Sequence, residues 1–305
     1  MKKTMLLIWL ILGMVSLYGA GDLHMFIVPN KDGKINATVV EKALEANGFV
    51  ISANSEMNGP FVKQFGKSDF AQFNLLTAFH KTLSDSLLRA HPDAGIFLPM
   101  GFGIYQRTGG KELYVSVLTA RAMKKIAGFD APEFALIEKE VLSTLKKALP
   151  GAKMTMSKTS LPAQGTLITR YVKPTDATNW AADKDSTEMM IEEGLKPAGF
   201  VLSNFTDYNF ILNESAVPSP FDFYDTYSIC KLKVIYTVAK THPEAAAFAP
   251  CTLMVYKKKD SNEMVMGFPG VYNWMSSAHV TDTDGKAALL QAQKDFEEVL
   301  KSATE

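Results

Sequence analysis

A single offset of 151 residues aligns the two halves of this chain without a gap, and this internal repetition limits the fold more than any other feature. Identical residues recur at this spacing over most of each half. The pairs are Glu41/Glu192, Leu44/Leu195, Gly48/Gly199, Phe49/Phe200, Val50/Val201, Ser52/Ser203, Phe70/Phe221, His91/His242, Pro92/Pro243, Phe97/Phe248, Pro99/Pro250, Tyr105/Tyr256 and Glu112/Glu263. A unit of this length is too long for a solenoid repeat, so each copy should be a domain. The expected organisation is a first domain at 21–150, a linker at 151–165 and a second domain at 166–305.

Hydrophobic patterning predicts the same order of strands and helices in both copies. The first copy is expected to have strands at 24–28, 49–53, 70–79, 102–106 and 112–118, and helices at 36–46, 81–90 and from 130 onward. The second-copy counterparts include strands at 167–172, 200–204 and 221–230 and a helix at 231–241. Gly48 and Gly199 end the first helix of each copy, because glycine readily adopts the left-handed conformation of a helix C-terminus. Hairpins and short helices between strands favour an α+β fold, with a mixed or antiparallel sheet and packed helices in each domain.

The second copy differs from the first by an insertion at 173–185, which we expect to form a loop or lid. Trp180 lies in this insertion. Two roles are open for its indole ring, which either packs against the seam between the domains or contacts a ligand.

The N-terminus has the pattern of a secretory signal peptide. Lys2 and Lys3 precede an uncharged, mainly apolar stretch at 5–18, and small residues follow at 19–21. This stretch is shorter than the roughly 20 residues that a membrane-spanning helix needs, and we expect no membrane span in the mature chain. The short Lys-Lys start is typical of bacteria, so we expect cleavage near Ala20 and a periplasmic protein. An uncleaved anchor is the alternative.

The balance of charges argues against general nucleic-acid binding. Lys and Arg together number 32, as do Asp and Glu, so no positive excess is available to neutralise phosphates. With 47% hydrophobic and 21% charged residues the chain can bury substantial cores, which excludes a disordered or coiled-coil protein. The expected partner is therefore a small-molecule ligand or another protein in the periplasm.

A series of residues in the second copy surrounds its two cysteines. The series comprises Phe223, Tyr224, Ser228, Ile229, Cys230, His242, Pro243, Glu244, Pro250, Cys251 and the strand at 253–256. A Cys precedes a helix, an acidic turn follows the helix, and a Pro-Cys pair opens the next strand. This stretch, about half of each copy, resembles the bacterial "domain of unknown function 302" family, which implies an α+β domain without an established activity. The first copy departs from the pattern, with Phe79 in place of Cys230 and Met100 in place of Cys251.

The two cysteines leave three interpretations open. An even number of cysteines in an exported protein first suggests a disulfide, here between Cys230 and Cys251. Buried free thiols are the second interpretation. A reactive pair with redox or metal chemistry is the third, because Cys230 lies at the expected start of a helix beside Lys231, and both features stabilise a thiolate.

The recurring His91 and His242 also have two interpretations. They either interact with carbonyls at a helix end or line a seam between the domains. His24, His80 and His279 are scattered without the grouping of a zinc site, so we assign no metal and no cofactor. Catalytic signatures such as the Gly-x-Ser-x-Gly elbow and the phosphate-binding loop are absent from the sequence.

These observations favour a ligand-binding or accessory protein over an enzyme, because two fused domains recreate a dimer with a central groove. We expect the domains to meet across a pseudo-two-fold interface. The candidate groove residues are Phe70, Phe73, His91, Trp180, Phe221, Tyr224 and His242. Core packing is the default role of the aromatic ones. The alternative function is a thiol-dependent redox or metal-handling protein that uses Cys230 and Cys251.

Overall fold

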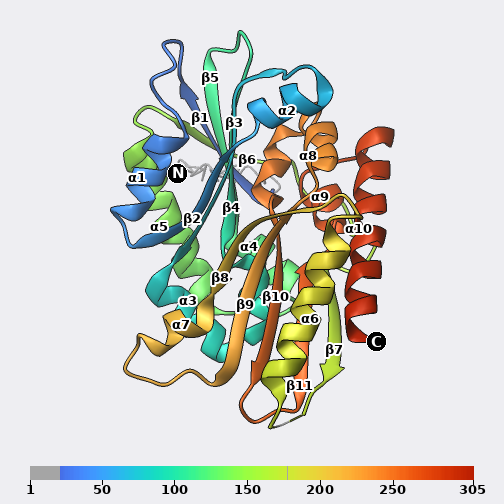
Figure 1. The fold of residues 1–305 in the computed structure, drawn as a ribbon. Coiled ribbons are helices and arrows are strands. Elements are labelled where there is room, and N and C mark those ends of the chain that lie inside the picture. Colours follow the sequence, from blue (N-terminus) through green and yellow to red (C-terminus); the bar gives the residue numbers. More distant parts are fainter. Residues whose placement is uncertain (1–20, 177) are drawn as a thin grey trace, which may run out of the picture.

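Two antiparallel sheets, one for each repeat, form the framework of the molecule, and helices pack on them (Figure 1). The computed structural model describes residues 21–176 and 178–305, so the predicted signal segment lies outside the described residues. The α+β fold with two homologous domains is confirmed. Within the described ranges, no helix has both the length and the hydropathy needed to cross a membrane.

Among the described residues the first sheet has six strands in the order β2-β3-β4-β5-β1-β6. They are β1 (Leu23–Pro29), β2 (Phe49–Glu56), β3 (Phe70–His80), β4 (Met100–Arg107), β5 (Glu112–Leu118) and β6 (Lys153–Met156). The helices of this half are α1 (Ala37–Glu45), α2 (Asn58–Phe65), α3 (Lys81–Ala90), the 3-10 helix η1 (Pro92–Phe97), α4 (Ala120–Ala127) and α5 (Pro132–Ala148). Since β6 pairs with β1, the segment expected to be a linker begins as an edge strand of the first sheet.

The described part of the second sheet has five strands in the order β7-β11-β10-β9-β8. They are β7 (Ile168–Pro174), β8 (Val201–Asp207), β9 (Phe221–Cys230), β10 (Cys251–Lys258) and β11 (Glu263–Pro269). Its helices are α6 (Trp180–Leu195), α7 (Tyr208–Asn213), α8 (Leu232–Ala239), the 3-10 helix η2 (Pro243–Phe248), α9 (Tyr272–Ser277) and α10 (Thr283–Thr304).

Local sequence explains where the first helix of each repeat lies. In α1 the Asn36 side chain accepts a hydrogen bond from the Val39 amide, which satisfies a free N–H of the first turn. Val40 and Leu44, one turn apart, bury their side chains completely. Gly48 follows with a φ of +84°, the left-handed conformation that glycine adopts most easily.

The insertion at 173–185 is not a loop or lid, so that prediction was wrong. β7 continues to Pro174, and helix α6 begins at Trp180. Apolar spacing did not reveal this helix, because Asp183 and its polar neighbours occupy its first turns. Its buried residues begin only at Thr187. Helix α6 is the counterpart of α1, lengthened at its N-terminal end.

The two repeats agree in the register of their strands as well as in their order. Strand β2 pairs with β3, and β8 with β9, in antiparallel registers that coincide when 151 is added to each number. A bulge passes over Ser52 in β2 and over its counterpart Ser203 in β8. The duplication therefore preserves backbone detail down to one irregular residue.

The repeats exchange equivalent contacts across a pseudo-two-fold axis. Helix η1 packs on β10, and its counterpart η2 packs on β4. The Tyr256 hydroxyl donates to Asp93 Oδ1 at 2.7 Å. On the related side, burial and the charge of Glu244 raise the pKa of Tyr105. Strands β2 and β8, the last strands of their sheets, lie side by side (Figure 1). These reciprocal contacts are those expected from an ancestral dimer.

The seam between the repeats is tightly held. One hydrophobic core continues through both repeats, and a smaller one lies between the second sheet and helices α6 and α10. Asp22, which is 1% exposed, forms ion pairs with Lys125 and Arg121 of α4. It also accepts a hydrogen bond of 2.6 Å from the Ser277 hydroxyl of the second repeat. Apolar contact and a buried carboxylate therefore both fix the arrangement of the repeats.

Candidate functional site

A cavity of about 250 Å³ lies between the two repeats, and we call it the inter-repeat cavity. It is lined by Ala53, Ser55, Glu56, Met57, Pro60 and Leu75 of the first repeat and by Val201, Ser203, Cys230, Leu232 and Pro250 of the second. Most of these side chains are apolar. Concave apolar spaces where domains meet are common sites for small-molecule ligands.

Two sheet edges build the walls of this cavity. Strands β2 and β8 are the outermost strands of two separate sheets, and they approach each other at the seam. Helix α2 follows β2 directly, so that Met57 and Pro60 cover one side. The cavity is partly open to solvent, since Val201 in its wall is 58% exposed, and the two sheets determine the positions of the elements around it.

The pseudo-equivalent position on the other side of the axis is filled. By the 151-residue offset, the counterparts of Met57 and Cys230 are Tyr208 and Phe79. The ring centroids of Phe79 and Tyr208 lie 4.9 Å apart in an edge-on arrangement, and both side chains are buried. We call this pair the filled seam, and the Met57 and Cys230 position the open seam. Two aromatic rings occupy at one seam the space that two slimmer side chains leave open at the other.

Two polar groups in the cavity wall, Glu56 and Ser203, already have partners. The Glu56 carboxylate accepts hydrogen bonds from the amides of Asn58, at 2.6 Å, and Gly59, at 3.0 Å, at the start of α2. The Ser203 hydroxyl donates to the Ser228 carbonyl at 2.9 Å. A ligand therefore forms few new hydrogen bonds with Glu56 and Ser203, which favours apolar molecules.

The two cysteines are unbridged, and their side chains leave opposite faces of the second sheet. Cys251 lies directly opposite Ile229, so these two side chains share one face. Cys230 follows Ile229 along β9 and points to the other face. There it lines the inter-repeat cavity beside Val201, its partner on β8. A disulfide needs both side chains on one side, so the structure does not support the bridge expected from the sequence.

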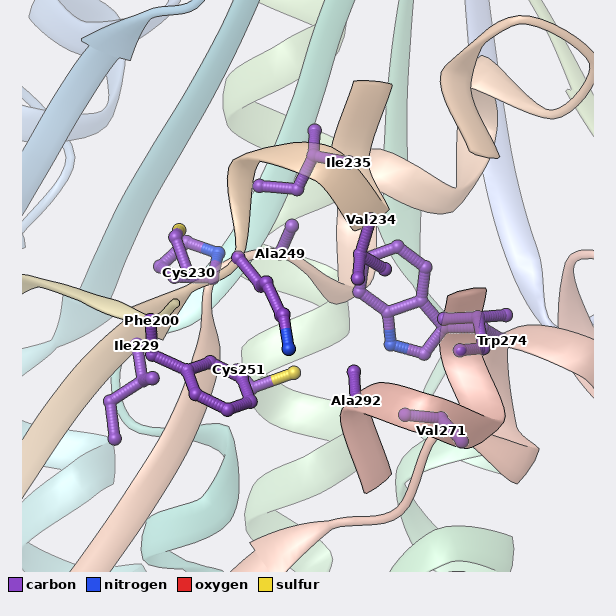
Figure 2. A pocket seen from close by; sticks show the side chains of 13 residues that line it. Phe200, Ile229, Cys230, Val234, Ile235, Ala249, Cys251, Val271, Trp274 and Ala292 are labelled. Carbon is purple, nitrogen blue, oxygen red and sulfur yellow. The ribbon is translucent and has the colours of Figure 1, made fainter. Parts of the chain in front are cut away.

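A second, smaller cavity of about 40 Å³ adjoins Cys251, and we call it the thiol cavity. Its walls also include Cys230, with Phe200, Ile229, Val234, Ile235, Ala249, Val271, Trp274 and Ala292. Figure 2 shows the Cys251 sulfur pointing into this space toward Ala292, whereas the Cys230 sulfur points away from it. In the first repeat the larger Phe79 and Met100 occupy the two cysteine positions, and both are buried.

Burial also determines the ionisation of the thiols. It raises the pKa of Cys230 and of Cys251 to about 12. Lys231, which was expected to stabilise a thiolate, instead forms an ion pair with Asp295 and lies 4.8 Å from the centre of the Phe200 ring. Reactive and metal-binding cysteines act as thiolates, whereas these two stay protonated at neutral pH. The structure does not support the reactive-pair interpretation.

The four Phe and Tyr groove candidates belong to the core instead. The centroids of Phe70 and Phe73 lie 4.7 Å apart, and those of Phe221 and Tyr224 lie 4.9 Å apart. All four side chains are buried. The Tyr224 hydroxyl donates to the Pro92 carbonyl of the first repeat. Tyr224 thereby joins the two repeats, and none of the four rings lines the inter-repeat cavity.

The other three candidates lie at separate places. His91 stacks on Phe129 with ring centroids 4.4 Å apart, and Trp180 stacks on Phe223 at 5.7 Å. His242 lines a different cavity at the seam, against β1 and β6. The two recurring histidines therefore do not face each other across one groove. Across residues 21–176 and 178–305, no three His, Cys, Asp or Glu side chains are grouped to hold a metal ion.

Sequence reasoning singled out Cys230 but missed most of the cavity wall, Met57 and Val201 among it. A signal was present in the repeat itself. At the constant offset Met57 aligns with Tyr208, and Cys230 aligns with Phe79, so each copy has an aromatic ring where the other has a sulfur. Only the fold shows that Met57 and Cys230, from different repeats, adjoin one space.

Comparisons with known proteins agree with the division into repeats. The model of the family described as "Domain of unknown function DUF302" matches residues 34–151 and again residues 177–303. A solved structure, the uncharacterized conserved protein DUF302 from Bacillus stearothermophilus, is similar at 17% identity and a TM-score of 0.38. That match covers 46% of this chain and 100% of the other. No curated protein matches the chain.

Proposed function

The chain belongs to the DUF302 family, and from this premise we propose that it is an exported protein that binds a small apolar molecule in the inter-repeat cavity. The family is described as a domain of unknown function, so the proposal rests on the geometry of this chain. The observation that supports it is the open seam. There the protein leaves a space between Met57 and Cys230 that aromatic rings fill at the equivalent position.

The physical properties of the cavity suit an apolar ligand. Water is held poorly in an apolar space, because it lacks hydrogen-bond partners there. An apolar cavity of about 150 Å³ is enough to bind benzene, and the inter-repeat cavity measures about 250 Å³. A ligand that enters it removes its apolar surface from water, which contributes about 25 cal/mol for each Å² buried.

The walls of the cavity are formed before a ligand arrives. Strands β2 and β8 of the walls belong to the two sheets, helix α2 follows β2 directly, and one hydrophobic core joins the two repeats. Little ordering of the protein is then required on binding, which leaves more of the interaction energy for affinity.

Export rests on the sequence of the N-terminus, with Lys2 and Lys3 before the apolar stretch at 5–18. The protein should be recovered from the periplasmic fraction of a bacterial host, and N-terminal sequencing should begin at or near Gly21. Recovery of the full-length chain from the cytosol would contradict this part of the proposal.

Calorimetric titration with two probes, 1-hexanol and p-cresol, tests the binding function. At least one probe should bind the wild-type protein with one site per chain. The Cys230→Phe variant carries the residue of the filled seam and should lose this binding. Its matched control is Cys251→Met, which also restores a first-repeat residue but on the opposite face of the sheet, and which should bind normally. The absence of binding by both probes would overturn the proposed function.

A further inference from the structure

The open seam and the filled seam share the same strand register and several identical residues, which we call the frame. They differ in the side chains that occupy the space between the repeats. Three residue types recur unchanged around both positions. They are Val50/Val201, Ser52/Ser203 and Pro99/Pro250, of which Val201, Ser203 and Pro250 line the inter-repeat cavity. The register of β2 against β3 is also that of β8 against β9. The filled seam therefore shows which kind of group this frame accommodates.

Aromatic rings are what the frame accommodates. At the filled seam, Phe79 and Tyr208 come from different repeats and meet edge-on, with 4.9 Å between their centroids. The Tyr208 ring also meets Tyr224 at 6.3 Å, and Tyr208 is 1% exposed. At the open seam both rings are replaced, by Cys230 and Met57. The space at the open seam thus lies where the filled seam has two aromatic rings, one from each repeat.

The residues that replace the rings favour an aromatic occupant for a second reason. Cys230 and Met57 are the two sulfur-containing residues in the wall of the cavity. Sulfur is polarizable and makes favourable contacts with the edges of aromatic rings. Glu56 carries the one charge among the lining residues, so the wall offers no cation to an anionic ligand.

From these observations we infer that the ligand of the inter-repeat cavity is an uncharged aromatic molecule of one ring or two fused rings. It takes the place at the open seam that the rings of Phe79 and Tyr208 take at the filled seam. This inference rests on the proposed function and names the chemical class of its ligand.

A matched pair of probes separates this inference from the proposed function. The compounds p-cresol and 4-methylcyclohexanol have the same substituents, and only the first has an aromatic ring. Calorimetry should show p-cresol binding the wild-type protein roughly threefold to tenfold more tightly. The anion p-hydroxybenzoate should bind more weakly than p-cresol.

Three variants locate the effect. Cys230→Phe should abolish p-cresol binding, and Met57→Tyr, the counterpart change in the other repeat, serves the same purpose if the first variant does not fold. Met57→Leu keeps a similar volume without sulfur and should weaken p-cresol binding roughly threefold, with a smaller effect on 4-methylcyclohexanol.

The outcomes are distinguishable. Equal affinity for the two matched probes, or tighter binding of 4-methylcyclohexanol, would overturn the aromatic inference while leaving an apolar binding site in place. Binding of p-cresol that survives both Cys230→Phe and Met57→Tyr would also overturn it, because the molecule would then bind elsewhere. Failure of all probes, 1-hexanol included, would overturn the proposed function itself.

Discussion

Cys230 and Cys251 lie at the ends of two paired strands, and their side chains leave opposite faces of one sheet: Cys230 adjoins both the inter-repeat cavity and the thiol cavity, whereas Cys251 adjoins the thiol cavity. The Cys230 side chain faces the seam between the repeats, and the Cys251 thiol faces the interior of the second repeat. Both replace bulkier residues of the first repeat, Phe79 and Met100. The two cysteines therefore mark two places where the second repeat has less side-chain volume than the first.

Both thiols should be free and unreactive in the folded protein. Without reductant, the protein unfolded in guanidinium should give two titratable thiols per chain with Ellman's reagent, because Cys230 and Cys251 are unbridged. In the native protein the reaction should continue to accelerate up to high pH, since burial raises both pKa values to about 12. Two outcomes would contradict this account: no thiols after unfolding, or a native titration midpoint at or below the ordinary value of about 8.5.

Stability should fall as the pH rises toward neutrality because of Asp225. This side chain is 2% exposed, and burial together with the carboxylates of Glu188 and Asp207 raises its pKa to about 7, although Lys184 lies 2.9 Å away. Between about pH 4 and pH 7 the folded state thus keeps a proton that the unfolded state releases, so stability decreases across this window.

Asp225→Asn, which restores the Asn74 of the first repeat, should remove this dependence. Its melting temperature should exceed that of the wild type by a margin that grows between pH 5 and pH 8. If the melting temperatures of the two proteins change with pH in the same way over this range, Asp225 is not the source of the pH dependence.

Loss of the Asp22 carboxylate should loosen the seam. Burial alone would raise the pKa of Asp22, but Lys125, Ser277 and Arg121 lower it on balance, so the ionised carboxylate stabilises the fold above the ordinary carboxyl range. Asp22→Ala removes one partner of a buried ion pair and should cost about 3 kcal/mol of unfolding free energy.

The control for Asp22 is Asp32→Ala, because the ion pair of Asp32 with Lys34 is solvent-exposed. This change should leave the free energy of unfolding nearly unchanged, because water screens an exposed ion pair. Urea unfolding measures both variants. Equal losses in the two would show that Asp22 has no special part in joining the repeats.

The filled seam should open on substitution. Phe79→Cys places the residue of the open seam beside Tyr208, and the lost ring should cost about 3 kcal/mol of unfolding free energy. If the two frames are equivalent, the variant should also gain a second site for p-cresol. Calorimetry that still finds one site in the folded variant would argue against the equivalence of the seams.

The constant offset was enough to predict the duplication, the α+β class and most strands, because each element could be read in two copies. The directions of the Cys230 and Cys251 side chains could not be predicted from the sequence. They depend on the register of β9 against β10, and α8 and η2 lie between these strands in the chain. The first turns of α6 were missed because Asp183 and its neighbours lack apolar spacing.

The candidate groove was misplaced for a physical reason. Recurring aromatics such as Phe73 and Tyr224 are candidates for it in the sequence, with core packing as their default role, and the structure places these large rings in the core, where complete burial stabilises most. The cavity lies instead where the copies differ, at Met57 and Cys230. In a duplicated chain, positions of agreement describe the shared frame, and positions of disagreement indicate where one copy has acquired a separate role.

The most direct test of this account is a crystal structure of the mature protein grown with 4-bromophenol, in which the anomalous signal of bromine locates the ring. We expect one strong peak in the inter-repeat cavity, between Leu75 and Val201, and none beside the Phe79 and Tyr208 pair. Bromine found only outside this cavity, or a cavity that stays empty at saturating 4-bromophenol, would contradict it.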